Sequence, residues 1–317
     1  MEPRPSTFSI VARDPETEAV GVAVQSKFVS VGSVVPFAGA DAGAVATQSF
    51  ANVAYGPDGL DLLRAGKSAE EVVAALTDDD PEAAQRQVGV VGQDGSVAAF
   101  TGEECFEVAG DRQGETYTVQ GNILENEETL DAMARAYESA ETAGAGLPER
   151  LLAALHAGNE AGGDSRGEQS AAMYVAKPEG GYDGKNDRWI DVRVDDHEAP
   201  IDELERVFKI YDVTLLEREE PEDLRELSGE AAEEVAATLA DLGFYEESGA
   251  PDATDAGEFG PADREALEAF RGMNNFENHD LAAVEDALAR GWDDAAGTGE
   301  DRLVDAIWHG LSRLDRK

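Results

Sequence analysis

Residues 7–27 read TFSIVARDPETEAVGVAVQSK, and this stretch decides the fold. Apolar and polar side chains alternate from Thr7 to Arg13 and again from Ala19 to Val24. Between the two runs lies Asp14-Pro15-Glu16, a typical turn sequence. Alternation on both sides of a turn predicts an antiparallel β-hairpin at the start of the fold.

The register of this hairpin brings a hydroxyl and a cationic side chain together at its open end. If the turn is centred near residue 15 or 16, the numbers of paired residues sum to roughly 32. Thr7 then faces Gln25, with Ser26 and Lys27 just beyond. A threonine that opens one strand would thus lie beside a lysine that ends the next.

A threonine beside a lysine at this position is a recognisable arrangement for nucleophilic catalysis. The Thr7 hydroxyl is a weak nucleophile that needs a base. A free α-amine on the same residue has a pKa near 8 and can act as that base. The Lys27 cation would lower the pKa of the amine. The alternative interpretation is a threonine with ordinary strand propensity and a surface lysine.

The rest of the chain shows blocks of strands separated by pairs of helices. This order predicts an α+β fold, in which two antiparallel sheets pack together with helices outside. A doubly wound parallel sheet ranks second, because it would need single helices between single strands. Ser68 and Glu71 have the spacing of a capping box for one of these helices. The expected strands cover residues 42–48, 87–91, 96–101, 117–120, 169–176 and 188–194, and the expected helices cover 59–65, 69–76, 127–140, 148–157 and 201–214.

The polar stretch EREEPE at 217–222 marks a domain boundary. Beyond it the pattern is helical, over about 229–242, 261–270, 280–288 and 301–314. About 95 residues suffice for a small domain. We therefore expect an N-terminal extension over 1–6, a main domain over 7–216 and an acidic, mainly helical domain over 217–317.

The chain is strongly acidic, with 68 Asp and Glu against 25 Lys and Arg and a formal net charge of −43. An acidic chain repels the phosphate backbone, so nucleic acid is not an expected partner. Molar salt shortens the Debye length to roughly 3 Å and removes most of the self-repulsion. The composition therefore favours a salt-adapted cytoplasm, as in a halophilic archaeon. A merely acidic mesophile protein is the alternative.

Several other classes are disfavoured. The sequence has no run of 18 apolar residues and no apolar region of the kind found in export signals near its start, so we expect a cytoplasmic protein without a membrane partner. The single cysteine, Cys105, excludes an internal disulfide. With no histidine nearby in sequence, we expect it to be a half-buried structural thiol rather than a nucleophile. The four histidines are scattered without ligand spacing, so we expect neither a metal nor another cofactor.

Polar residues at the ends of two expected strands are candidate walls of a pocket. Thr47-Gln48-Ser49 with Asn52 ends one strand, and Gln120-Gly121-Asn122 ends another. Their amides can donate to a developing oxyanion, which is usually the largest catalytic contribution. The alternative is ordinary turn chemistry.

Residues 162–170, GGDSRGEQS, form the most specific polar motif. Its glycine pair allows a close backbone approach. Asp164 and Arg166 can pair with each other or bind a zwitterionic substrate, because an arginine forks onto a carboxylate. Gln169 and Ser170 open an otherwise apolar strand, where polar groups need partners.

The chain also resembles a known family from residue 7 to about 216. The stretches that carry the resemblance are TFSIVARDPET, GVAVQSKFVSVGSVVPFA, GAVATQSFANVAYGPDGLDLL, RQVGVVGQDGSVAAFTGEEC, VQGNIL, AGGDSRGEQSAAMYV and GYDGKNDRWIDVRVDDH. Together they resemble the domain-of-unknown-function family numbered one thousand and twenty-eight. The resemblance implies a four-layer αββα fold of the N-terminal-nucleophile (Ntn) hydrolase type, and amide-bond hydrolysis as the default chemistry.

In this family the threonine of the TFSI motif commonly follows the initiator methionine directly, and Thr7 matches it. Here MEPRPS precedes Thr7, so exposure requires cleavage between Ser6 and Thr7 or stepwise trimming. Position 27 is more often arginine in the family, and either residue supplies a cation. The candidate catalytic residues are Thr7, Lys27 and Asn122, and the candidate substrate-binding residues are Gln25, Ser26, Gln48, Asn52, Gln120, Asp164, Arg166, Gln169 and Ser170.

The segment LADLGFYEESG, followed by GPADREALEAFRGMNNFEN, resembles the peptidoglycan-binding-like domain that some family members append. We expect it to act in dimerisation or as a lid. For the whole chain we expect an Ntn-type amidohydrolase that cleaves a small amide, a cyclic imide or a short peptide, as a homo-oligomer. The alternatives are a non-catalytic small-molecule-binding protein on the same fold and an assembly protein.

Overall fold

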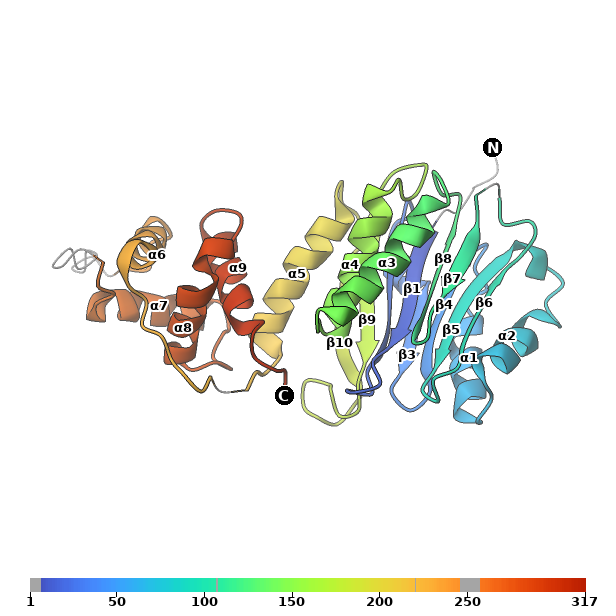
Figure 1. Cartoon of the computed structure of the whole chain (residues 1–317), viewed down its shortest axis with the longest axis horizontal. Helices are drawn as coiled ribbons and strands as arrows, with labels where there is room; N and C mark the ends of the chain where they lie inside the picture. The colour runs from blue at the N-terminus through green and yellow to red at the C-terminus, as the bar shows by residue number, and fades with distance from the viewer. Residues whose placement is uncertain (1–6, 107, 220, 246–256) are drawn as a thin grey trace. The chain divides into compact units, whose positions relative to one another are not determined.

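The predicted hairpin is present as strands β1 (Thr7–Arg13) and β2 (Val20–Ser26), which pair antiparallel (Figure 1). The predicted register is wrong by one residue, because Thr7 lies opposite Ser26 and not opposite Gln25. The connection covers residues 14–19, so its centre lies later than Pro15. Side chains alternate between the two faces of a strand, so Gln25 points to the face opposite from Thr7.

Ten strands of the described residues form two antiparallel sheets. The six-stranded sheet has the order β10-β9-β2-β1-β8-β7, and the four-stranded sheet has the order β3-β4-β5-β6. The α+β prediction is thus confirmed, and the doubly wound parallel alternative is wrong. The further strands are β3 (Pro36–Gly39), β4 (Gly43–Ser49), β5 (Arg86–Gly92), β6 (Val97–Thr101), β7 (Gly110–Gln113), β8 (Tyr117–Asn122), β9 (Ser170–Ala176) and β10 (Arg188–Val194).

The structure adds two edge strands to those expected, β3 and β7, each four residues long. β3 begins with Pro36, which lacks an N–H, and β7 is polar throughout. Neither shows the alternation that marks a half-buried strand. Both are specified by pairing to a longer neighbour, β4 and β8 respectively.

The sheets of the first unit pack face to face, and helices cover their outer faces (Figure 1). α3 (Glu128–Thr142) and α4 (Leu147–Glu160) lie on the six-stranded sheet, and α1 (Tyr55–Arg64) and α2 (Ala69–Thr77) lie on the four-stranded sheet. The predicted capping box of α2 is confirmed, with Ser68 and Glu71 bonding each other's backbone N–H groups.

The interior between the sheets changes from apolar to polar along β1. Val11 belongs to a buried cluster with Val22, Val24 and Val91. Toward the open end of the hairpin, Ser9 and Thr7 replace the apolar side chains on the same face. The sandwich therefore has a packed half and a polar half, and the polar half contains the candidate site.

The chain divides into two compact units, Met1–Glu205 and Arg206–Lys317. The division falls inside α5 (Pro200–Leu215), whereas the sequence places the boundary at 216/217. The structure describes residues 7–106, 108–219, 221–245 and 257–317, so the expected extension 1–6 lies outside the described residues.

The second unit contains α6 (Gly229–Asp241), α7 (Pro261–Met273), α8 (Leu281–Gly291) and α9 (Glu300–Leu311) around one apolar core. A Cβ on Gly310 would lie 2.1 Å from the Ala287 carbonyl oxygen, so α8 and α9 approach closely because Gly310 has no side chain. This unit also contains the buried carboxylate of Asp212. Asp212 forms ion pairs with Arg218 and Arg316 and accepts a hydrogen bond from the Trp308 indole.

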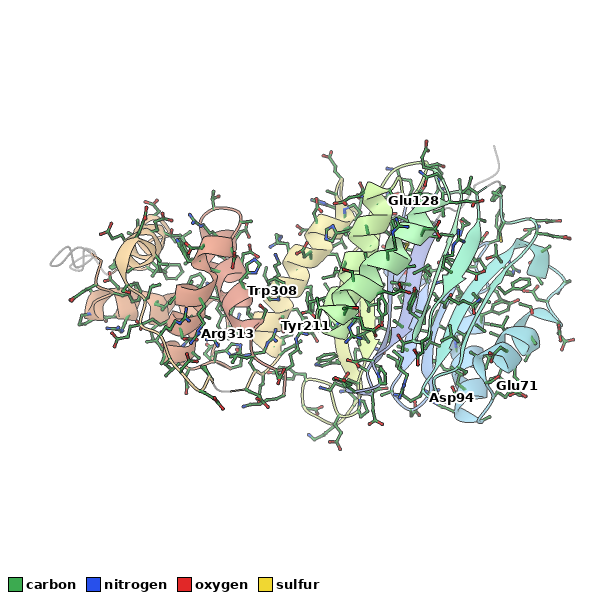
Figure 2. All side chains as sticks on the ribbon, viewed as in Figure 1. Glu71, Asp94, Glu128, Tyr211, Trp308 and Arg313 are labelled. Atoms are coloured by element: carbon green, nitrogen blue, oxygen red, sulfur yellow. The ribbon has the colours of Figure 1, made fainter. Side chains whose placement is uncertain are left out.

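Acidic side chains project from the outer helices and turns of the first unit, among them the exposed Glu71, Asp94 and Glu128 (Figure 2). Thus the acids are distributed over the surface and do not form a single tail. No helix in the described part of the chain is long and apolar enough to cross a membrane.

Candidate functional site

Four polar residues form one row across the six-stranded sheet. Ser170 on β9 pairs with Ser26 on β2, Ser26 pairs with Thr7 on β1, and Thr7 pairs with Asn122 on β8. Directly opposed residues point to the same face of an antiparallel sheet. All four are buried, with Thr7 at 4% exposure. Buried hydroxyls and amides are costly unless they find partners, so this row is a specific polar feature.

Thr7 is held on both its side chain and its backbone. Its hydroxyl oxygen lies 3.0 Å from the Ser26 hydroxyl oxygen. Its carbonyl accepts a long hydrogen bond of 3.4 Å from the Gln48 side-chain amide. β1 thus places Thr7 between its own sheet and the facing sheet, at the polar end of the sandwich.

Glutamine and asparagine side chains join the two sheets behind Thr7. Gln48 donates to Gln87 at 2.8 Å and accepts from Ser9 at 2.6 Å. Gln120 donates to Ser9 at 2.6 Å, and Asn122 donates to Gln87 at 2.8 Å. This amide network (Ser9, Gln48, Gln87, Gln120 and Asn122) fixes the strands around Thr7. Gln48 also donates to the Gln120 carbonyl at 3.3 Å, so its amide protons are already engaged.

Two residues of β5, Gln87 and Gly89, complete the amide network. Gln87 was not among the predicted residues, although a glutamine in an otherwise apolar strand calls for partners inside the sandwich. A Cβ on Gly89 would lie 2.2 Å from the Gln120 side-chain oxygen. Gly89 therefore leaves the space that the Gln120 amide fills.

A cavity of about 570 Å³ opens beside Thr7. That volume fits a small ligand. Its walls combine apolar side chains with three cations and no acid among the described residues. The lining residues are Thr7, Lys27, Phe28, Val31, Val34, Val35, Gln48, Ser49, Phe50, Ala51, Arg86 and Arg166.

Asp164 anchors two of the cationic residues. Its carboxylate is fully buried and accepts from the Lys27 backbone N–H at 2.9 Å. It also accepts from the Arg166 guanidinium at 3.0 and 3.2 Å. The Lys27 ammonium, which is exposed, donates to the Glu168 carbonyl at 2.8 Å. Lys27 and Arg166 line the cavity, whereas Asp164 does not line it and holds both of them in place.

Ser170 shapes the segment that forms one wall. Its hydroxyl donates to the Phe28 carbonyl and accepts from the Val31 N–H at 3.1 Å. Phe28 and Val31 both line the cavity. The neighbouring Gln169 instead donates to Asp196 at 2.9 Å and does not line it.

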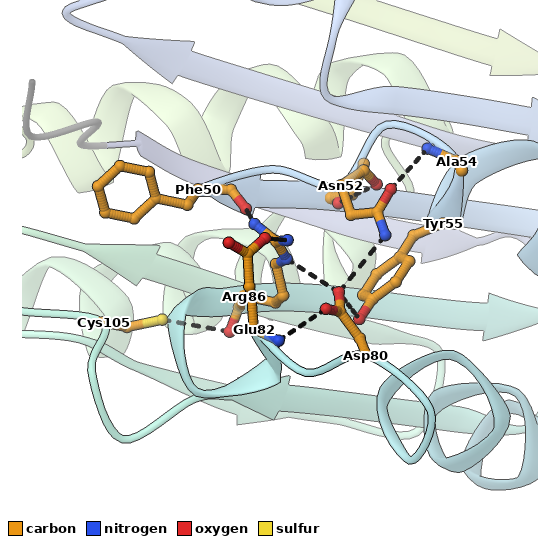
Figure 3. Close-up of polar contacts among 9 residues, drawn as sticks. Phe50, Asn52, Ala54, Tyr55, Asp80, Glu82, Arg86 and Cys105 are labelled. Atoms are coloured by element: carbon orange, nitrogen blue, oxygen red, sulfur yellow. Dashed lines mark hydrogen bonds and ion pairs between the residues drawn. The ribbon is translucent and has the colours of Figure 1, made fainter.

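Arg86 reaches the cavity from the facing sheet, and a polar cluster fixes it there (Figure 3). It donates to Asp80 at 3.0 Å and to the Phe50 carbonyl at 2.6 Å. Asp80 also accepts from the Tyr55 hydroxyl at 2.8 Å and from Asn52 at 3.4 Å. The predicted residue Asn52 therefore supports Arg86 and is absent from the cavity wall.

The charge state of this cluster is set by its burial and its hydrogen bonds. Burial alone would raise the pKa of Asp80. The Glu82 N–H and the Arg86 guanidinium outweigh that effect and hold the pKa of this carboxyl far below its usual value. Burial, together with the Asp80 carboxylate, raises the pKa of the Tyr55 hydroxyl. Asp80 is therefore a carboxylate and Tyr55 a neutral donor at neutral pH.

Ser49 is a lining residue with an unusual conformation. Its backbone φ is 67°, in the left-handed region that non-glycine residues seldom adopt. Its hydroxyl is buried and makes no hydrogen bond of good geometry with the described residues. Burial raises the pKa of the nearby Cys105 thiol. The Ser49 hydroxyl interacts weakly with this thiol and offsets only part of the rise in its pKa. Such strain and an under-used buried hydroxyl often mark functional sites.

The predicted residue Gln25 lies outside the site. It pairs with Phe8 and faces the helix layer, and both of its side-chain polar atoms are buried without partners among the described residues. Of the predicted residues, the cavity brings together Thr7, Lys27, Gln48 and Arg166. Ser26, Gln120, Asn122, Asp164 and Ser170 hold these residues in place, whereas Gln25, Asn52 and Gln169 do neither directly.

Sequence reasoning missed three groups of lining residues. Ser49 belongs to the Thr47-Gln48-Ser49 motif, but nothing in the sequence indicates its left-handed conformation. Arg86 carries no motif, and the apolar wall resembles ordinary core sequence. No group of three His, Cys, Asp or Glu side chains within the described ranges has the arrangement of a metal site.

Comparison with known proteins gives two family matches and solved structures that are similar to the chain. Residues 7–204 match the model described as "Family of unknown function (DUF1028)", and residues 214–308 match "Putative peptidoglycan binding domain". A crystal structure of protein SPO2555 from Silicibacter pomeroyi, titled as a DUF1028 protein, is 32% identical with a TM-score of 0.59. That match covers 65% of this chain and 89% of the relative. No curated protein matches the chain.

Proposed function

The chain belongs to the DUF1028 family, whose function is unknown, and we propose that it is an Ntn-type amidohydrolase with Thr7 as its nucleophile. The substrate would be a small amide, a cyclic imide or a short peptide. The helix–sheet–sheet–helix order of the layers is consistent with this class. Fold alone does not imply function, so the proposal rests on the site.

The observation that carries the proposal is the position of Thr7. It is a buried threonine at the first position of β1, its hydroxyl is oriented by Ser26, and it lines a cavity large enough for a ligand. A threonine hydroxyl reacts only when a base removes its proton. In the described structure the partner of that hydroxyl is Ser26, which is not a base at neutral pH.

Cleavage of the bond between Ser6 and Thr7 would supply the base. The new α-amine would belong to Thr7 itself, and its ordinary pKa is near 8. Lys27 follows Ser26 on β2 and carries a cation into the same cavity. A nearby cation favours the neutral form of an amine, which is the form that accepts a proton.

The reaction then follows from these groups. The Thr7 hydroxyl oxygen bonds to the substrate carbonyl carbon while its proton passes to the α-amine. The tetrahedral intermediate collapses, the amide C–N bond breaks, and the leaving nitrogen takes the proton. An acyl ester remains on Thr7, and a water molecule that the amine deprotonates hydrolyses it to release the carboxylic acid.

A β-lactone tests this proposal without knowledge of the substrate. An activated threonine hydroxyl opens the strained ring and keeps the whole probe as an ester. We expect the intact mass of the mature protein to rise by one probe, and the modified peptide to contain Thr7. Thr7→Ala should abolish labelling, and Thr7→Ser should retain it. Labelling that survives Thr7→Ala, or none in a chain that begins at Thr7, would overturn the proposal.

A second candidate is a non-catalytic binding or assembly protein on the same fold. The observation in its favour is that Thr7 is preceded by six residues and pairs with a hydroxyl, not with a base. This candidate predicts ligand-induced thermal stabilisation without turnover. The assembly version further predicts that a chain ending near residue 218 loses self-association in light scattering.

A further inference from the structure

The charge of the cavity is opposite to the charge of the chain. The protein has 68 acidic and 25 basic residues, yet the described cavity wall holds Lys27, Arg86 and Arg166 and no acid. Arg86 pairs with the half-buried Asp80 and the exposed Glu82, and Arg166 pairs with the buried Asp164. None of these three carboxylates lines the cavity. The three cationic residues therefore line the cavity, and the carboxylates of Asp80, Glu82 and Asp164 are not part of its wall.

Lys27 differs from the two arginines. Its ammonium donates to the Glu168 carbonyl, and no described carboxylate lies within ion-pair distance of it. Its backbone is held by Asp164, so the residue has a fixed root and an uncompensated charge at the cavity. A charge-assisted hydrogen bond to an anion is stronger than one between neutral groups.

Two further features of the cavity wall indicate which other groups a ligand should have. Phe28, Val31, Val34 and Phe50 make one part of the wall apolar. The Ser49 hydroxyl is buried in the same wall and lacks a well-formed hydrogen bond within the described residues. A buried hydroxyl whose neighbour is a weak thiol partner gains free energy when a ligand carbonyl accepts its hydrogen bond.

We propose that this cavity binds an N-acyl amino acid or similar small carboxylate, with the carboxylate on Lys27, the amide carbonyl on Ser49 and an apolar side chain against Phe28 and Phe50. The inference rests on the proposed function, because it names the substrate class of the same site. Of the two alternatives for Asp164 and Arg166, the described structure has the pair with each other, and this proposal does not use the zwitterionic substrate. Asp164 is fully buried and bonded to Lys27 and Arg166, so it cannot bind a ligand ammonium group.

Binding to a protein without the nucleophile tests the substrate class separately from catalysis. The protein is the Thr7→Ala variant, both as the full chain and as the chain that starts at residue 7. The probes are N-acetyl amino acids with apolar side chains, each paired with its neutral carboxamide, and calorimetry gives the Kd. We expect the carboxylate of at least one pair to bind at least about tenfold more tightly than its carboxamide.

Substitutions assign this preference to residues. Lys27→Gln should remove the preference for the carboxylate, and Ser49→Ala should weaken both members of a pair while preserving it. Lys185→Gln is the matched control, because Lys185 is an exposed lysine away from this cavity, and it should change nothing. Circular dichroism melting verifies that each variant is folded.

The outcomes separate the two proposals. Equal binding of carboxylate and carboxamide, a preference that survives Lys27→Gln, or no binding of any carboxylate by either chain form would overturn the substrate class. If the class fails while a β-lactone still labels Thr7, the nucleophile stands. If carboxylates bind and Thr7 is inert in a chain that begins there, the binding site stands and the hydrolase does not.

Discussion

The Thr7 and Ser26 hydroxyl oxygens lie 3.0 Å apart across β1 and β2, at the buried end of the hairpin. This contact orients the Thr7 oxygen but does not activate it, because a serine hydroxyl is not a base near neutral pH. The proposed activity therefore depends on an amine that only cleavage before Thr7 can create. Lys27 comes directly after Ser26 in the sequence, and both Thr7 and Lys27 line the cavity.

Asp164→Asn tests the anchor of the cationic wall. The carboxylate is fully buried and bonds the Lys27 N–H and the Arg166 guanidinium. Removing its charge breaks the ion pair with Arg166, although Arg166 is 30% exposed and water compensates in part. We expect a loss of about 2 kcal/mol in the free energy of unfolding, measured with urea. Carboxylate binding should weaken in parallel.

Asp183→Asn is the matched control for that change. Asp183 pairs with Lys185 on the surface, where the two side chains are 49% and 82% exposed. Exposed ion pairs contribute about 0–1 kcal/mol. An Asp164→Asn variant as stable as the control would contradict the anchoring role.

Asp80→Asn should change the pH dependence of stability. The folded-state pKa of Asp80 is lowered, so its contribution is present above the ordinary pKa of about 3.9 and is lost as the pH falls through the lower folded value. We expect the variant to be less stable than the wild type by about 2 kcal/mol at pH 7. Urea unfolding in molar KCl should show that this gap narrows toward pH 3.

The same titration contains its own control. Glu82 pairs with the same Arg86 but is 64% exposed, so Glu82→Gln should leave the pH profile close to that of the wild type. A constant gap between wild type and Asp80→Asn from pH 7 to pH 3 would refute the assignment of the lowered pKa to Asp80.

Salt should stabilise the whole chain. A net charge of −43 spread over the surface is self-repulsive at low ionic strength, and about 1 M salt screens it to roughly 3 Å. We expect the melting temperature to rise steadily from dilute buffer to molar KCl. A melting temperature that does not change with KCl would contradict adaptation to salt.

Local sequence signals predicted the hairpin, the long strands and the capping box of α2. They failed where structure is set by partners distant in sequence. β3 and β7 are short edge strands specified by β4 and β8, and the β1–β2 register depends on a turn that extends to Ala19. The one-residue error in that register moved Gln25 into the predicted site and left Ser26 one position away from Thr7.

The candidate site was predictable only in part for the same reason. Thr7, Lys27 and Arg166 stand in recognisable motifs. Arg86 and the apolar wall come from segments that the fold brings together, and the left-handed conformation of Ser49 cannot be seen in the sequence. The predicted oxyanion donors Gln48, Gln120 and Asn122 belong to the amide network that Gln87 completes, and Gln87 is the member that the sequence did not indicate.

The central claim depends on the bond between Ser6 and Thr7, and the intact mass of the purified protein tests it most directly. The proposal predicts a mature chain whose first residue is Thr7, in the wild type and in Thr7→Ser. A mature protein that keeps any of residues 1–6 would contradict it, because the α-amine that should activate Thr7 would then be locked in a peptide bond.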